Sequence, residues 1–149
     1  EPLQAAVESG DVHVIQMFHT YTSLNQSAAE KLIPSAVEKG ISVLNSAPYA
    51  GYILATGPTP DARYNYAPAS DDVIEAARRL EAVCAEKGVD LPTAALAFSF
   101  RNPAIDVTVP ASGKTKRIPQ WISAMNVPLT NEDWEEILAA AGGEYELRF

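Results

Sequence analysis

Three short apolar runs, separated by longer helical patterns, constrain the fold of this chain more than any other feature. The runs lie at residues 11–18, 41–44 and 105–109 and are rich in apolar side chains, as in strands covered on both faces. Strands that alternate with helices predict right-handed βαβ units and a parallel sheet, and therefore an α/β fold. The predicted helices occupy residues 1–9, 27–40, 71–87, 92–101, a segment that begins near 115, and 130–142.

Local sequence signals mark where several of these helices begin or bend. The segment Ser27-Ala-Ala-Glu30 has the pattern of a capping box. Pro34 lies inside the same helix and is predicted to kink it, because proline has no N–H to donate. Ser70 is placed to cap the longest helix, and Thr130 is placed to start the last one.

The segment over residues 50–70 is rich in Pro, Gly and Tyr and separates the second strand from the longest helix. Segments of this length without regular structure are usually functional or disordered. Its three tyrosines, Tyr52, Tyr64 and Tyr66, favour an ordered lid over a flexible linker.

Three strands are too few to close a barrel, which needs about eight. With 149 residues, the chain fits one domain with a real core. It begins at Glu1 rather than at Met, with no charged and then apolar leader ahead of the fold. We therefore expect the chain to begin inside a larger fold, and its sheet to expose an apolar inner face.

Composition narrows the classes of partner. A net charge of −8 and a pI near 4.7 argue against nucleic acid or an anionic membrane as the main partner. No apolar stretch reaches the ~20 residues that cross a bilayer. Cys84 is the only cysteine, so no internal disulfide can form, which fits a cytoplasmic protein.

A cluster of bases follows the third strand in this acidic chain. Lys114, Lys116 and Arg117 lie within four positions, close to the start of a predicted helix. Ser112 offers a hydroxyl and Arg117 a bidentate fork, so the segment is a candidate phosphate site. The alternative is a solvated basic turn that balances an acidic protein.

Other chemically reactive side chains give weaker signals. His13 and His19 are six positions apart on the first predicted strand and are therefore expected on one face. Either is a candidate general base, and the alternative is a buried or edge histidine with a backbone partner. No metal site is predicted, and Cys84 is expected in the core. Two carboxylate pairs are expected to be solvated: Asp71-Asp72 and Glu135-Glu136.

The segment after the third strand resembles the cofactor-binding segment of aldo-keto reductases. Its Val-Pro-Ala-Ser, then four residues, then Arg-Ile and Gln, is similar to the family motif Ile-Pro-Lys-Ser, four residues, Arg-Ile-x-Glu-Asn. The resemblance implies that Ser112 and Arg117 contact the 2′-phosphate of NADPH. It implies that Gln120 contacts the edge of the adenine.

Two positions of this segment depart from the family motif. Ala111 stands where the family has lysine, and Trp121 stands where it has asparagine. The choice between NADP and NAD therefore stays open, and Lys114 or Lys116 is a candidate to restore the lost charge. Binding of either dinucleotide by this chain alone is expected to be weak.

The resemblance extends to the first two strands. Gln16 occupies the position of the family glutamine that contacts the nicotinamide amide. The family sequence Tyr-Ser-Pro-Leu, which ends the next strand, is Ser-Ala-Pro-Tyr here and places Ser46, Pro48 and Tyr49 at the cofactor. Ser46 cannot stack on the nicotinamide ring as the family tyrosine does. Gly51 continues the cofactor segment, and Tyr52 replaces a glycine expected near the pyrophosphate.

The resemblance implies that residues 1–149 form the C-terminal portion of a (β/α)8 TIM barrel, with its last three parallel strands. The segments that begin at Tyr64 and Pro92 are most similar to the sugar-oxidising branch, the L-fucose, L-galactose and D-threo-aldose dehydrogenases. The family's catalytic Asp, Tyr, Lys and His lie on earlier strands, so no catalytic residue is assigned here.

Two main functions therefore stand as hypotheses. In the first, the chain is the cofactor-binding part of an NAD(P)-dependent oxidoreductase for a sugar or small aldehyde, completed by a missing N-terminal segment. In the second, it is a truncated, non-redox structural or binding module that self-associates. A third and weaker idea assigns non-redox chemistry to His13 or His19.

Overall fold

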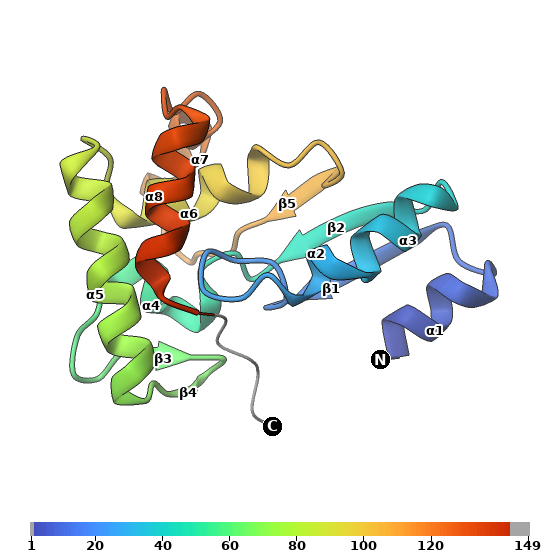
Figure 1. Ribbon diagram of the computed structural model, residues 1–149, viewed down its shortest axis with the longest axis horizontal. Helices are drawn as coiled ribbons and strands as arrows, with labels where there is room; N and C mark the ends of the chain where they lie inside the picture. Colours follow the sequence, from blue (N-terminus) through green and yellow to red (C-terminus); the bar gives the residue numbers. More distant parts are fainter. Residues whose placement is uncertain (1, 144–149) are drawn as a thin grey trace.

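A central sheet of three parallel strands organises the molecule. The computed structural model describes residues 2–143. Its strands are β1 (Val14–Phe18), β2 (Ser42–Ser46) and β5 (Val107–Val109), in the order β1-β2-β5. Figure 1 shows them side by side and running in one direction. The predicted α/β fold with three parallel strands is therefore confirmed.

Helices precede, connect and follow these strands (Figure 1). The segment between β2 and α5 contains short helices and a two-stranded antiparallel hairpin, so the region predicted as an ordered lid has regular structure. The remaining elements are α1 (Pro2–Ser9), α2 (Ser27–Glu30), α3 (Leu32–Glu38), the 3-10 helix η1 (Ala50–Tyr52), α4 (Ile53–Thr56), β3 (Arg63–Tyr64), β4 (Ala67–Pro68), α5 (Asp71–Glu86), α6 (Leu91–Phe100), the 3-10 helix η2 (Thr115–Arg117), α7 (Ile118–Ala124) and α8 (Asn131–Ala141).

Only one face of the sheet is covered by helices. Ile15, Met17 and Val43 are buried on the side where β1 and β2 contact α1 and α3. On the opposite side, Val14 and Phe18 are 53% and 41% exposed. The expectation that both faces are covered is therefore wrong for this chain alone, because three strands do not curve round to meet each other.

The helix ends agree with the predictions in part. The predicted capping box at Ser27 is wrong, because the N-cap residue of α2 is Gln26 and no side chain caps it. The helix predicted over residues 27–40 is divided at Lys31 into α2 and α3. Pro34 has no N–H, so it cannot donate to the carbonyl of Glu30 across this break. At the last helix, Thr130 forms a full capping box.

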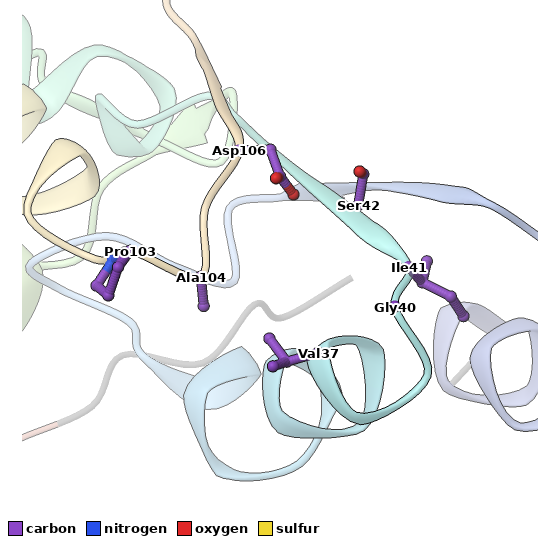
Figure 2. Close-up of a pocket in the computed structure, with 7 residues that line it drawn as sticks. All are labelled: Val37, Gly40, Ile41, Ser42, Pro103, Ala104 and Asp106. Atoms are coloured by element: carbon purple, nitrogen blue, oxygen red, sulfur yellow. The ribbon is translucent and has the colours of Figure 1, made fainter.

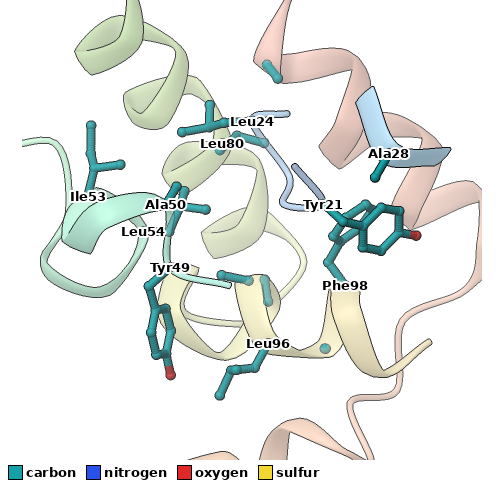
Figure 3. Packing of buried hydrophobic residues seen from close by; sticks show 14 of the residues in the cluster. Tyr21, Leu24, Ala28, Tyr49, Ala50, Ile53, Leu54, Leu80, Leu96 and Phe98 are labelled. Atoms are coloured by element: carbon teal, nitrogen blue, oxygen red, sulfur yellow. The ribbon is translucent and has the colours of Figure 1, made fainter. Parts of the chain in front are cut away.

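A second group of helices packs beyond the sheet, where α5 contacts α6 and α8. Cys84 is fully buried on α5, as predicted, and burial raises the pKa of its thiol to about 11. Figure 3 shows Tyr21 and Phe98 lying against each other in this core, and their rings are stacked with centroids 4.8 Å apart. The core therefore extends from the loop after β1 to α6.

A buried polar network joins this core to the sheet. The Asn45 Nδ2 atom on β2 donates to the Tyr21 carbonyl oxygen at 2.9 Å and to the Ser99 hydroxyl on α6 at 2.8 Å. The Ser99 hydroxyl also lies 2.6 Å from that of Thr108 on β5. The network connects β2, β5 and α6 and so fixes the C-terminal halves of the strands.

Candidate functional site

The C-terminal ends of the strands meet at one edge of the sheet. Phe18 pairs in register with Ser46, and Ser46 pairs with Val109. Several residues just beyond these ends have left-handed backbone conformations, with φ of 61° at His19 and 56° at Ala47. Such strained conformations in residues other than glycine concentrate at functional sites. In parallel α/β sheets, ligands bind at this edge.

Gln16 lies on the open face of the sheet, two residues before Phe18. Its side chain is exposed, and Leu44 is its neighbour on β2. Within residues 2–143, the amide of Gln16 has no hydrogen-bond partner. This placement fits the role that the resemblance implies for Gln16, which stays a prediction.

Ser46 does not present its hydroxyl to the open face. The side chain is buried, and its hydroxyl donates to the Met17 carbonyl oxygen at 2.5 Å. The residue therefore ties the ends of β1 and β2 together. Its small volume leaves the surface beside Phe18 free of a bulky side chain from β2.

Pro48 and Tyr49 are buried where the chain leaves β2. Burial raises the pKa of Tyr49, while the nearby Trp121 indole and Arg117 guanidinium act in the opposite direction. Tyr49 is therefore a neutral phenol that connects the end of β2 to the segment after β5. Of the predicted cofactor residues, the structure thus brings Tyr49 and Arg117 into one neighbourhood.

Gly51 supports the hairpin formed by β3 and β4. Its φ is 71°, and a Cβ atom added there would lie 2.4 Å from the backbone nitrogen of Asn65 and 2.8 Å from that of Tyr66. Only glycine lets the tip of the hairpin approach so closely. This contact gives Gly51 a structural role that the sequence did not reveal, and its contact with a cofactor stays a prediction.

The basic segment after β5 forms an exposed turn. The Ser112 hydroxyl accepts a hydrogen bond from the Lys114 backbone N–H at 3.0 Å. Lys114 and Lys116 are exposed, whereas Arg117 is half-buried. The segment therefore carries three cations and a hydroxyl within six residues, and its contact with a phosphate stays a prediction.

Gln120 lies on α7 and contacts the start of α6. Its Nε2 atom donates to the Asp90 carboxylate at 3.3 Å and to the Thr93 hydroxyl at 3.4 Å. Asp90 is the N-cap residue of α6 and also accepts from the Thr93 backbone N–H. The Gln120 amide is thus engaged through its nitrogen, which leaves its carbonyl oxygen as an acceptor.

The two histidines are not on one strand face, so that prediction is wrong. His13 precedes β1 and is exposed, whereas His19 follows β1 and is only 1% exposed. Neither ring nitrogen of His19 has a hydrogen-bond partner within residues 2–143, so the predicted backbone partner is absent there. Burial lowers the pKa of His19 to about 4, which leaves the imidazole neutral near pH 7.

Sequence reasoning missed a group of exposed aromatic rings at this edge. Phe18, Tyr52 and Tyr66 are 41%, 51% and 47% exposed. The Phe18 and Tyr66 rings stack with centroids 5.8 Å apart, and Tyr52 meets Tyr66 edge-on at 5.8 Å. The even spacing from Gln16 to Phe18 would have placed Phe18 on the same face. We call these three residues the aromatic platform.

One pocket lies at the other end of the strands. Figure 2 shows Ile41 and Ser42 at the start of β2, with Asp106 just before β5. The Asp106 carboxylate accepts a hydrogen bond from the Val43 backbone N–H at 2.7 Å. None of the predicted site residues lines this pocket, so we assign it no part in the candidate site.

Within residues 2–143, no group of three His, Cys, Asp or Glu side chains is placed to hold a metal ion. No helix in the same range combines the length and the apolar character that a bilayer span needs.

Comparisons with known proteins point to one family. The sequence model of the Aldo/keto reductase family matches residues 1–141. A D-threo-aldose 1-dehydrogenase of Pseudomonas sp is 24% identical over 141 residues, which cover 94% of this chain and 43% of the relative. A pyridoxal 4-dehydrogenase of Microbacterium luteolum is 24% identical over 132 residues, which cover 89% of this chain and 39% of that relative.

A solved structure gives the same result for the fold. Aldo-keto reductase AKR11C1 from Bacillus halodurans, in its holo form, matches with a TM-score of 0.73 and 20% identity. The match covers 97% of this chain and 48% of that one, so this chain spans less than half of each of the three proteins. The structure thus confirms the predicted partial barrel. Because the family match covers nearly the whole sequence, the chain belongs to the aldo/keto reductase family.

Proposed function

We propose that this chain is the dinucleotide-binding C-terminal part of an NAD(P)-dependent aldo-keto reductase that acts on a sugar or small aldehyde. The observation that carries the proposal is the basic turn of Ser112, Lys114 and Arg117 after β5, in a chain of this family that also exposes Gln16 on the open face of the sheet. The names of the two relatives contain an aldose and pyridoxal, and both compounds have a carbon atom at the oxidation level of an aldehyde. An aldehyde or its hemiacetal is therefore the proposed substrate.

These residues fit a nicotinamide dinucleotide. Lys114 and Arg117 offer positive charge to a 2′-phosphate, which an acidic chain otherwise repels. The free carbonyl oxygen of Gln120 can accept from the adenine amino group while its nitrogen stays on α6. The exposed amide of Gln16 can pair with the carboxamide of the nicotinamide.

These residues bind and orient, and they do not move the catalytic proton. When bound, the nicotinamide would exchange a hydride with the substrate carbonyl carbon. We propose that the acid–base side chains belong to barrel strands that this chain does not contain. His19 does not replace them, because it is buried and its pKa is lowered to about 4.

The phosphate assignment is tested with adenosine 2′,5′-bisphosphate and 5′-AMP as separate probes. We expect the bisphosphate to bind the parent chain more tightly, and Arg117→Ala to weaken it by about 10-fold to 100-fold, because charge-assisted hydrogen bonds are lost. Isothermal titration measures both. Arg78→Ala is the matched control, since Arg78 is an exposed arginine on α5 that pairs with Glu75.

Two results would contradict this assignment. Equal affinity of the parent for the two probes would show that no 2′-phosphate site exists. Full affinity for the bisphosphate after Arg117→Ala would show that this arginine does not hold it.

One observation favours a second candidate, a non-redox module that self-associates. The open face of the sheet exposes Val14, Phe18, Val107 and Val109, each at least 37% exposed. A folded monomer rarely leaves such a face in water. This candidate requires that the chain form homo-oligomers and bind neither adenine probe.

A further inference from the structure

We propose that the pocket at the start of β2 binds an alkylammonium ion, with the Asp106 carboxylate holding the positive charge. The pocket lies between the end of α3 and the connection from α6 to β5 (Figure 2). None of the candidate cofactor residues lines it, so the inference does not depend on the proposed function.

The walls of the pocket suit a short aliphatic chain. Its volume of about 430 Å³ lies within the range of small-molecule sites. Val37 on α3 lines one side, and Pro103 and Ala104 line another (Figure 2). The Val37 side chain is 55% exposed, so this wall has apolar surface for a ligand to cover.

Asp106 is the charged residue among those that line the pocket, and its position is fixed. The Oδ2 atom accepts a hydrogen bond from the Val43 backbone N–H at 2.7 Å, and the Asp106 backbone N–H donates to the Val43 carbonyl oxygen at 3.0 Å. The other carboxylate oxygen, Oδ1, has no hydrogen-bond partner within residues 2–143. The carboxylate is therefore held in place with one oxygen available to a donor.

Within the described part of the chain, no cation pairs with this carboxylate. Two cations close to the pocket in sequence are engaged elsewhere. The Lys39 Nζ atom donates to the Glu8 carbonyl oxygen at 3.4 Å, and the Arg101 guanidinium lies 5.1 Å from the centre of the Trp134 ring. A bound cation would supply the missing counter-charge beside the apolar walls.

These features select an amine that carries an apolar body. An ammonium group has three N–H donors and no acceptor, so it matches the open oxygen of Asp106. Its aliphatic chain would cover Val37 and Ala104 and remove their apolar surface from water. A carboxylate ligand of the same length is repelled by Asp106 in a chain of net charge −8. Free amines and lysine side chains present the same group, so the test includes both.

The test titrates the full chain with n-pentylammonium, n-pentanol and pentanoate, which are similar in length and differ in charge. Two-dimensional NMR follows the backbone amides of Gly40, Ser42 and Ala104, because these residues line the pocket. We expect saturable shifts with n-pentylammonium, at least about 5-fold weaker binding of n-pentanol, and no saturable shifts with pentanoate. A separate titration with N-acetyl-lysine methylamide distinguishes the sources, since tighter binding of this probe would assign the pocket to a lysine side chain of a partner.

Two variants separate the charge from the apolar wall. Asp106→Asn removes the charge but keeps an acceptor for the Val43 N–H, and it should weaken binding of n-pentylammonium about 5-fold to 30-fold. Asp61→Asn is the matched control, because Asp61 is an exposed aspartate ahead of β3 that does not line the pocket. Val37→Ser should weaken binding of n-pentylammonium but not of methylammonium, which has no chain to cover the wall. Urea unfolding checks that each variant keeps its fold.

Three results would overturn the proposal. If n-pentanol or pentanoate binds as tightly as n-pentylammonium, the pocket does not recognise the charge. If a folded Asp106→Asn variant keeps the parent's affinity, another group holds the ammonium. If the amides of Gly40, Ser42 and Ala104 do not shift, the amine does not bind in this pocket. The first and third results come from the parent chain alone, and the probes contain neither adenine nor phosphate, so the proposed function stands or fails separately.

Discussion

His19 lies at the end of β1 among aromatic rings, and its surroundings determine its chemistry. The Phe18, Tyr64 and Tyr66 rings lie 4.4 Å, 6.3 Å and 5.5 Å from its ring, centroid to centroid. The two ring nitrogens have no hydrogen-bond partner within residues 2–143, and burial alone lowers the pKa to about 4. At a pH where a solvent-exposed imidazole would be protonated, keeping this imidazole uncharged lowers the stability of the folded chain.

The chain should therefore lose stability in mild acid. The folded-state pKa of His19 lies below the unfolded value of 6.5, so the unfolded chain takes up the proton first as the pH falls. The loss begins near pH 6.5, grows until about pH 4 and amounts to at most about 3 kcal/mol from this group. Urea unfolding at pH 7.5 and pH 4.5 measures it.

His19→Asn should remove this part of the pH dependence, because asparagine does not titrate and tolerates the φ of 61°. His13→Asn, which removes an exposed imidazole, is the matched control and should keep the parent's behaviour. The same loss of stability in His19→Asn as in the parent would assign the effect to other groups.

For single residues, the sequence predicted chemical character better than it predicted which side chains are buried and what they contact. The spacing around Arg117 identified the basic turn, and the apolar helix pattern placed Cys84 in the core. The burial of His19 and the hydrogen bond from the Ser46 hydroxyl to Met17 depend on how β1 and β2 end side by side. Those contacts are tertiary, and no local pattern encodes them.

The hairpin of β3 and β4 is the element whose position depends most on a single residue. The tip of the hairpin packs against Gly51, and the backbone nitrogens of Asn65 and Tyr66 leave no room for a side chain at position 51. Three tyrosines indicated an ordered lid in the sequence. The left-handed turns that shape it, at Tyr52 and Tyr66 among others, arise in residues that rarely adopt them and could not be predicted.

Gly51→Ala should destabilise the chain much more than Gly88→Ala. Both glycines have positive φ, but a Cβ atom at Gly88 meets nothing within 4 Å, whereas one at Gly51 lies 2.4 Å from Asn65 nitrogen. Gly88→Ala should cost about 1 kcal/mol for the backbone conformation. Gly51→Ala should cost about 1–3 kcal/mol more, because the hairpin must move.

Thermal and urea unfolding of the two variants measure this difference. The Gly51→Ala variant should also lose the contact between Phe18 and Tyr66, since the hairpin tip carries Tyr66. Equal losses of stability in the two variants would show that the hairpin adjusts to the added methyl group without cost.

At the scale of the whole molecule, one layer of helices covers one face of a three-stranded sheet. The alternation of strands and helices predicted this architecture and the number of strands correctly. It could not predict which face the helices cover, because the first strand is apolar on both sides, where Val14 alternates with Ile15, and the exposed Val107 of β5 is apolar as well. The open face is apolar because a closed barrel would bury it.

The open face should make the isolated chain associate at micromolar concentration. Val107→Lys places a charge on this face and should weaken association at least about 10-fold, since a charge buried at an interface must be desolvated. Sedimentation velocity over a concentration series measures it. Val37→Lys is the matched control, because Val37 is 55% exposed on α3 and Val107 is 47% exposed on the sheet.

A parent chain that sediments as a monomer at every concentration would show that the open face does not drive association. Weaker association in Val37→Lys than in Val107→Lys would place the contact on the helical side instead.

The strand order β1-β2-β5 has one more consequence, which concerns the rims of the sheet rather than its faces. The outer strands β1 and β5 each carry backbone groups that no third strand satisfies within the sheet. If a second copy extended the sheet in parallel, β5 of one copy would pair with β1 of the next. This contact is head-to-tail, so each added copy leaves another unpaired outer strand. Such growth stops only when the sheet curves into a closed ring, so the curvature of the sheet decides between a discrete particle and a fibre.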